Sequence, residues 1–191
     1  VRAIEQAEKY LEKNSELHSL GSIVHNSTEI SRLKEKGLNT INYDELSRMR
    51  DSVVFIRAHG EPPSSYKTAR ENNLTVIDCT CPVVLKLQER VKNNYKELKK
   101  VNGQLVIFGK VGHAEVNGLI GQVEGDAVIV EKMKDIEVLD FKRPIYIFSQ
   151  TTKDPEIYKQ VCDAIKERVA SVEGPVESFK AFNTTCGQVS S

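Results

Sequence analysis

The stretch LTVIDCTCPVVLKLQERVKNNYKEL, residues 74–98, decides the fold because it passes directly from a strand pattern to a helix pattern. Residues 74–78 are mostly apolar or β-branched, which is typical of a buried strand. Residues 83–101 then repeat apolar side chains at helical spacing, and Pro82 is well suited to the first helical position. A strand that leads straight into a long helix indicates a parallel α/β sheet.

The same alternation extends along the chain in both directions. We expect further strands at residues 19–24, 53–57, 105–108, 127–130 and 145–148, and helices at 2–14, 64–72 and 155–170. Another helix is expected to start at Asn26, a suitable N-cap, and to end at Gly37. The segments on either side of Cys81 are similar, so the sequence predicts an α/β fold of two similar small parallel-sheet domains, residues 1–80 and 81–185.

Composition excludes several classes of protein. The chain has 191 residues, and its 27 Lys and Arg residues balance its 27 Asp and Glu residues. This balance argues against a nucleic-acid partner. No apolar run reaches the roughly 18 residues that a membrane span needs, and the N-terminus shows no secretory signal. We therefore expect no association with nucleic acid or with a membrane.

The two ends of the sequence predict a fragment. Val1 already belongs to a helical pattern, whereas sheets of this class usually begin with a strand. Near the other end, residues 183–187 resemble residues 78–82, where a Thr-Cys pair ends a strand and a long helix follows. The sequence stops five residues after Cys186. We expect residues 186–191 to begin a truncated third domain.

Three of the four histidines directly follow an apolar strand pattern. They are His25, His59 and His113, and each has Gly or Asn nearby. The carboxyl ends of parallel strands share one edge of the sheet, where ligands bind. Three imidazoles at that edge are suited to binding an anion, although separate capping or loop roles remain the alternative. His18 lies within a strand pattern and is predicted to be structural.

Two cysteines have matching contexts. Cys81 and Cys186 each follow a threonine at a predicted strand end, and a helix N-terminus at such a position favours the thiolate that ligates metals. This repetition indicates a shared metal site, with a buried apolar role as the alternative. Zinc is a weaker choice because paired zinc-type spacing is absent. Cys162 has the spacing of a helix core with Ile157, Val161 and Ile165, while the role of Cys79 stays open.

An acidic residue and a polar triplet complete the candidate site. Glu115 follows His113 by two residues, and a carboxyl group beside an anion-binding histidine is unfavourable unless it carries a proton. The alternative is a helix-start glutamate favoured by the macrodipole. The triplet Gln150, Thr151 and Thr152 ends a predicted strand. It offers hydroxyl and amide groups to the same edge, or else an N-cap for the helix near Pro155.

These residues together resemble one family. The chain resembles the LytB-type 4-hydroxy-3-methylbut-2-enyl diphosphate reductases over essentially all of its length. The resemblance rests on motifs that occur in the family's order and spacing, namely Val24-His25-Asn26, Ala58-His59-Gly60, Cys79-Thr80-Cys81-Pro82, Gly112-His113-Ala114-Glu115-Val116-Asn117-Gly118, Gln150-Thr151-Thr152 and Thr185-Cys186.

The resemblance implies a trefoil of three similar α/β domains around a 4Fe-4S cluster, with one cysteine ligand from each domain. It implies an iron-sulfur oxidoreductase of the non-mevalonate pathway of isoprenoid biosynthesis. Such an enzyme removes the hydroxyl of 4-hydroxy-3-methylbut-2-enyl diphosphate with two electrons and two protons, giving isopentenyl and dimethylallyl diphosphate. A cytoplasmic location and a reduced ferredoxin or flavodoxin as electron donor are implied as well.

The resemblance also assigns roles to residues. Glu115 is implied as the proton donor, and Thr151 as part of a hydrogen-bond relay to the substrate hydroxyl. The other implied site residues are the diphosphate ligands His25, His59 and His113, the neighbours Gln150 and Thr152 of the relay, and the cluster ligands Cys81 and Cys186.

The resemblance further implies that the first cysteine ligand of the family falls before Val1. We therefore expect this chain alone to bind the cluster poorly and to be inactive. The alternative function is a non-catalytic module that binds a diphosphate ligand without redox chemistry.

Overall fold

The structure of the protein, a computed structural model, describes residues 2–23, 26–172 and 178–185. The chain forms two compact units, Val1–Val84 and Leu85–Ser191. His25 and Cys186 lie outside the described residues. In the described part of the chain, no helix is both long enough and apolar enough to cross a membrane.

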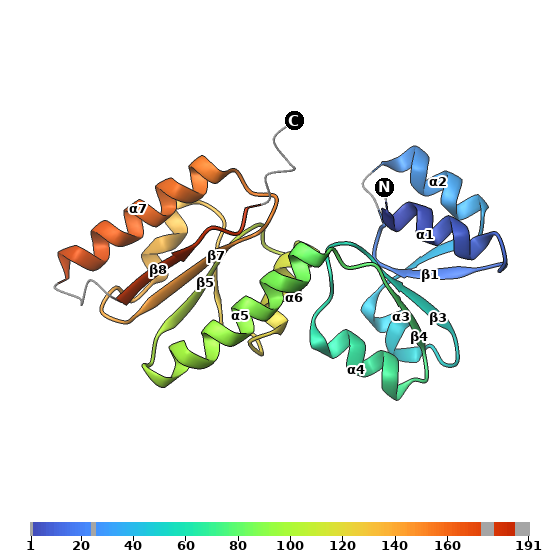
Figure 1. The fold of residues 1–191 in the computed structure, drawn as a ribbon, viewed down its shortest axis with the longest axis horizontal. Helices are drawn as coiled ribbons and strands as arrows, with labels where there is room; N and C mark the ends of the chain where they lie inside the picture. The colour runs from blue at the N-terminus through green and yellow to red at the C-terminus, as the bar shows by residue number, and fades with distance from the viewer. Residues whose placement is uncertain (1, 24–25, 173–177, 186–191) are drawn as a thin grey trace. The chain divides into compact units, whose positions relative to one another are not determined.

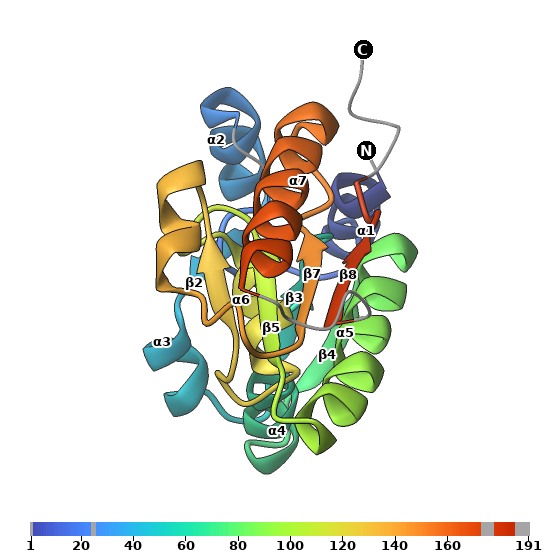
Figure 2. The same ribbon diagram turned by 90° about the vertical axis from the view of Figure 1, so that its left-hand side faces the viewer.

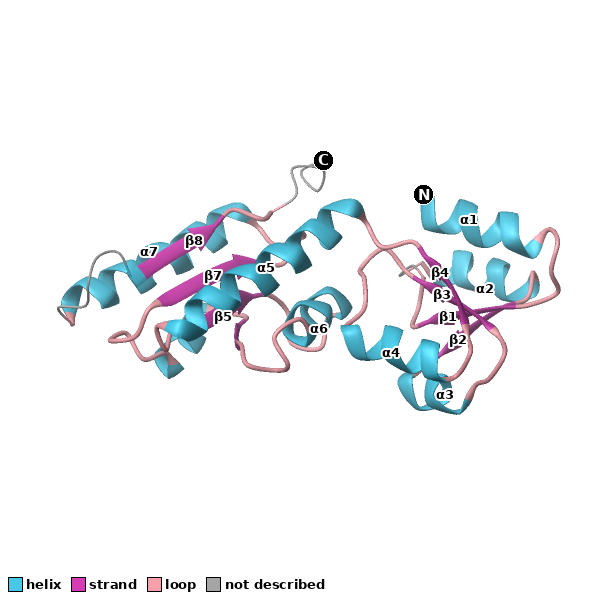
Figure 3. Cartoon of the chain, turned by 60° about the horizontal axis from the view of Figure 1, so that its bottom comes forward, coloured by secondary structure: helices cyan, strands magenta, loops and turns pink. Residues whose placement is uncertain are grey.

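The first unit is a four-stranded sheet covered by helices on both faces (Figures 1 and 3). All strand pairs are parallel and the order is β2-β1-β3-β4. Its strands are β1 (Leu17–Leu20), β2 (Leu38–Ile41), β3 (Val53–Ile56) and β4 (Thr75–Asp78), and its helices are α1 (Arg2–Leu11), α2 (Ser27–Glu35), α3 (Tyr43–Arg48) and α4 (Pro63–Glu71). One core joins α1 and α2 to the sheet through Ala7 and Leu33. The other joins α3 and α4 through Leu46 and Ala69.

The second unit repeats this plan. Its sheet has the order β6-β5-β7-β8, again with parallel pairs throughout. The elements are α5 (Pro82–Lys100), which leads into the unit, β5 (Gln104–Phe108), α6 (Ala114–Gly121), β6 (Val128–Val130), the 3-10 helix η1 (Met133–Val138), β7 (Ile145–Ser149), α7 (Pro155–Ser171) and β8 (Phe179–Phe182). Leu87 and Leu119 pack α5 and α6 on one face. Ile136 and Val161 pack η1 and α7 on the other, where α7 crosses the sheet (Figure 2). The predicted α/β class is confirmed.

Both sheets share a feature that positions ligands. In each, the first and third strands in chain order lie side by side, β1 beside β3 and β5 beside β7. The chain leaves these two strands toward opposite faces of each sheet. In the first unit, α2 covers one face and α4 the other. In the second unit, α6 covers one face and α7 the other. Ligands of open parallel sheets bind at the carboxyl ends of such strands.

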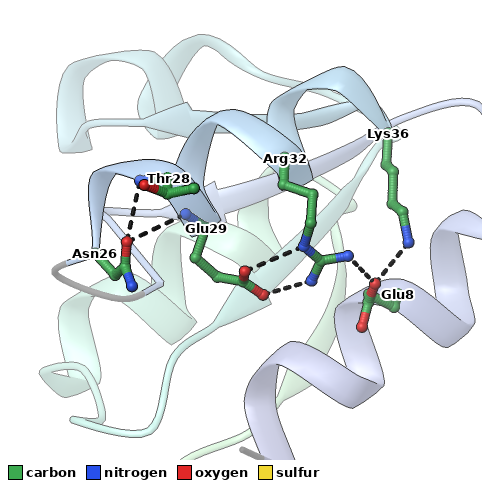
Figure 4. Close-up of polar contacts among 6 residues, drawn as sticks. All are labelled: Glu8, Asn26, Thr28, Glu29, Arg32 and Lys36. Carbon is green, nitrogen blue, oxygen red and sulfur yellow. Dashed lines mark hydrogen bonds and ion pairs between the residues drawn. The ribbon is translucent and has the colours of Figure 1, made fainter.

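Figure 4 shows how α2 is held at its start and along its side. The Asn26 side chain accepts hydrogen bonds from the amides of Thr28 and Glu29 at 3.0 and 3.3 Å, which confirms the predicted N-cap. Farther along, Glu8 of α1 forms ion pairs with Arg32 and Lys36. The side chains of Arg32 and Lys36 donate hydrogen bonds to the Glu8 carboxylate. These bonds, of which the one from Arg32 has the larger effect, lower the pKa of Glu8 to about 2.

Several sequence predictions need correction. The first strand is β1 at Leu17–Leu20 and not 19–24, because Gly21 adopts a left-handed φ of 73° and ends it. Cys162 lies in the α7 core as predicted, where burial raises the pKa of its thiol to about 11. Ile157 does not lie in this core, because its position on α7 is 49% exposed and Tyr158 packs inward instead. The predictions omitted β2, α3, α6 and η1, and gave no bounds for β8, the strand before Cys186.

Candidate functional site

In the first unit, the loop after β3 lies against the segment that carries Cys81. His59 belongs to this loop, which connects β3 with α4. The carbonyl oxygen of Ala58, the residue before it, accepts a hydrogen bond from the amide of Cys81 at 2.9 Å. Two predicted site residues from separate parts of the sequence are therefore on neighbouring, hydrogen-bonded segments at the carboxyl edge of the sheet.

Asp78 shapes the turn before Cys81. Its Oδ1 accepts hydrogen bonds from both the amide and the hydroxyl of Thr80, at 2.9 and 2.6 Å. Its Oδ2 accepts a hydrogen bond of 2.9 Å from the hydroxyl of Tyr66. Sequence reasoning missed this residue, although an Asp at a strand end two residues before a threonine is the pattern of an Asx turn.

The two cysteines of this segment differ in their surroundings. Cys79 is buried, and its thiol donates a hydrogen bond to Oε1 of Gln6 at 2.8 Å. Cys81 is a free thiol of intermediate exposure directly before α5. Partial exposure beside a helix N-terminus fits a metal-ligating cysteine. The described residues contain no group of three or more His, Cys, Asp or Glu side chains that could hold a metal, so Cys81 is a single candidate ligand there.

In the second unit, Glu115 and Thr151 form a buried pair. Glu115 is 1% exposed, and its two carboxylate oxygens accept hydrogen bonds from the amide and the hydroxyl of Thr151 at 2.7 and 2.8 Å. Burial raises the pKa of Glu115, although the two Thr151 donors partly oppose that rise. A carboxyl group in this setting holds its proton at a higher pH than an exposed glutamate does.

His113 stands at the N-cap of α6, next to this pair. Its Nδ1 accepts a hydrogen bond from the amide of Glu115 at 3.2 Å. Because Nδ1 accepts, the proton of the neutral ring is on Nε2, which is a donor suited to an anion. Glu115 lies in the first turn of α6 and is also buried. The two interpretations of Glu115 from the sequence, a helix-start glutamate and a proton carrier, are therefore compatible.

Gln150 connects two loops of the second unit. Its Oε1 accepts a hydrogen bond from the amide of Lys110 at 3.0 Å, and its Nε2 donates to Oγ1 of Thr152 at 2.7 Å. The loop after β5 is thereby tied to the loop after β7. The alternative that this triplet caps α7 is wrong, because the N-cap is Asp154, which accepts hydrogen bonds from the first-turn amides.

The predicted site residues thus fall into two sets. The first unit brings the loop of His59 to the segment of Cys81, and sequence reasoning missed Asp78 there. The second unit brings together His113, Glu115, Gln150, Thr151 and Thr152.

The family model described as LytB protein matches residues 1–191. The chain belongs to the LytB family. Its LytB relatives include the 4-hydroxy-3-methylbut-2-enyl diphosphate reductases of Parabacteroides distasonis and Porphyromonas gingivalis, to which it is 54% and 50% identical. Each match covers 99% of the chain and 64% of the relative, so the chain spans about 64% of the length of these relatives.

Solved structures of the LytB reductases have the same fold. The structure described as (E)-4-hydroxy-3-methyl-but-2-enyl diphosphate reductase, the terminal enzyme of the non-mevalonate pathway, is 32% identical with a TM-score of 0.78. That match covers 97% of this chain and 63% of the other. The Plasmodium falciparum reductase, at 24% identity and a TM-score of 0.80, supports the fold over 98% of this chain and 57% of its own.

Proposed function

We propose that this LytB protein is a 4-hydroxy-3-methylbut-2-enyl diphosphate reductase. It removes the hydroxyl of its substrate as water and forms isopentenyl and dimethylallyl diphosphate, consuming two electrons and two protons. The names of its relatives support the substrate. The observation that carries the chemistry is the buried pair of Glu115 and Thr151 beside the His113 N-cap.

Glu115 supplies the proton for the departing oxygen. A hydroxyl leaves far more readily as water than as hydroxide, so a positioned acid accelerates the step. When Glu115 is protonated, its hydrogen bond with the Thr151 hydroxyl reverses, and the carboxyl O–H donates to Oγ1 of Thr151. The threonine hydroxyl can then donate its own proton toward the substrate oxygen, as a relay.

The histidines bind the diphosphate. His113 lies at the start of α6, where helix amides also favour an anion. We assign the same role to His59 and His25 because, like His113, each follows an apolar strand pattern in the sequence. Gln150 and Thr152 hold the loop that presents Thr151.

Cys81 and Cys186 hold the cofactor in this proposal. Cys81 fits as a ligand because it is a free, partly exposed thiol that begins a long helix. The 4Fe-4S cluster, when bound, supplies the electrons and an iron that acts as a Lewis acid. We further propose that the protein works in the cytoplasm and receives electrons from a reduced ferredoxin or flavodoxin.

Replacement of the acid by its amide tests this function. In the complete gene product with its cofactor, Glu115→Gln should lower kcat by about 100-fold or more, since general acids contribute 10²–10⁴-fold. The dissociation constant for the substrate should change less than about threefold, because the amide keeps the size of the side chain. Glu97→Gln, on the exposed face of α5, is the matched control and should keep wild-type turnover. Near-normal turnover of Glu115→Gln would remove the proton-donor role.

A further inference from the structure

Arg57 bridges two loops of the first unit. It is the first residue after β3, two positions before His59. Its Nη1 donates a hydrogen bond to the carbonyl oxygen of Ser22 at 3.1 Å, in the loop after β1. Its guanidinium also lies on the backbone of Gly21, where an added Cβ would come within 2.5 Å of Cζ. Glycine at position 21 therefore allows this approach as well as the positive φ.

Glu61 holds the guanidinium from the other side. Oε1 of Glu61 lies 3.8 Å from Nη2 of Arg57, and the two side chains are only 1% and 16% exposed. Oε2 of Glu61 accepts hydrogen bonds from the hydroxyls of Tyr43 and Ser65 at 2.7 and 3.3 Å. Because these partners belong to α3 and α4, the carboxylate is fixed to the scaffold, and Arg57 is fixed through it.

The second unit has the same device in different residues. Gln150 is the first residue after β7, and Gly109 is the first after β5. An added Cβ on Gly109 would lie 3.2 Å from Oε1 of Gln150, which also accepts the Lys110 amide. In both units a long polar side chain after the third strand holds the loop after the first strand. In the second unit, Gln150 is directly next to Thr151, which belongs to the proposed proton relay.

We propose that Arg57 is a positioning residue for diphosphate binding, an inference that rests on the proposed function. Arg57 fixes Gly21 and Ser22, which follow β1, against the loop of His59, so that this edge of the sheet is already in place when the anion binds. Groups held in place before binding lose less conformational entropy when the ligand arrives. Arg57 acts through these loops and does not itself contact the ligand.

Inorganic pyrophosphate is the probe. We would measure its dissociation constant by calorimetry for the complete gene product with its cofactor, and for Arg57→Gln, Arg57→Lys and the double variant Arg57→Gln/Glu61→Gln. The double variant leaves no buried carboxylate without its cation. Arg70→Gln, on the exposed side of α4, is the matched control. Amide hydrogen exchange of residues 21–23 and the melting temperature are recorded for each variant.

All three Arg57 variants should bind pyrophosphate about tenfold more weakly, with faster exchange at residues 21–23 and an unchanged control. Lysine should not rescue binding, because its single ammonium group lacks the planar fork with which Arg57 contacts Ser22 through Nη1 and faces Glu61 through Nη2. Wild-type affinity in Arg57→Lys or in the double variant would overturn the positioning role, and so would faster exchange across the whole first unit. If the unaltered protein fails to bind pyrophosphate, the proposed diphosphate site fails, and this inference fails with it.

Discussion

In the part of the chain that the structure describes, each unit buries one glutamate at the carboxyl edge of its sheet, and the two differ in their neighbours. Glu61 and Glu115 are both 1% exposed, and burial raises the pKa of both carboxyl groups. Glu61 is surrounded by Arg57, Tyr43 and Ser65. The carboxylate oxygens of Glu115 accept hydrogen bonds from the amide and the hydroxyl of Thr151.

We attribute the different roles proposed for the two carboxyl groups to their neighbours more than to their burial. Glu61 lies beside a cation and forms an ion pair with Arg57. Glu115 is paired with a hydroxyl that can pass a proton in either direction, so it is suited to acid catalysis. Among the substitutions that we propose, replacement of Glu115 should have the largest effect.

Removing the Thr151 hydroxyl isolates the relay from the acid. Thr151→Val should lower kcat by about tenfold, because one hydrogen bond to a charged or reacting group is lost. The hydroxyl bond lowers the pKa of Glu115, so its removal raises that pKa. The activity that depends on protonated Glu115 should therefore persist to a higher pH. The measurement is kcat against pH, with exposed Thr75→Val as the control. An unshifted profile would show that Thr151 does not act on Glu115.

An ion pair in the first unit gives the smallest expected effect. The pKa of Glu8 is lowered from 4.5 to about 2, so its stabilisation is present above pH 4.5 and is lost as the pH falls toward 2. Glu8→Gln should lower the urea midpoint at pH 7, and the difference from the unaltered protein should disappear near pH 2. Exposed Glu12→Gln serves as the control. A difference of the same size at both pH values would mean that packing, not charge, is responsible.

Strands with continuous apolar or β-branched runs could be predicted from sequence, and these include the edge strands β4 and β6, whereas β2 and β8 could not. The cores of β3, β5 and β7 are continuous apolar runs, because these strands are buried on both faces. Strands β2 and β8 are at sheet edges, with the sequences LNTI and FKAF and partly exposed patterns. Pairing on one side alone tolerates polar residues, so the apolar signal is weak. The short helix α3 follows β2 and was missed with it.

Only part of the candidate site could be predicted from the sequence. The positions of His59 and His113 after strands could be predicted, since an apolar run followed by Gly and His marks a strand end. The contact of Glu115 with Thr151 joins residues 36 positions apart, and it exists because β5 and β7 are neighbours. Sequence spacing alone does not contain that pairing. The sequence does not distinguish Arg57 from other residues at strand ends. Its contact with Gly21 depends on the pairing of strands in the sheet.

In the proposed mechanism, Glu115 carries a proton that an exposed glutamate would have lost. The most direct test is a pH titration of the side-chain carboxyl carbons by NMR in the complete gene product, with Glu115→Gln to assign the signal. We predict that Glu115 titrates above 4.5, the ordinary glutamate value. A Glu115 midpoint at or below 4.5 would overturn the proton-donor role.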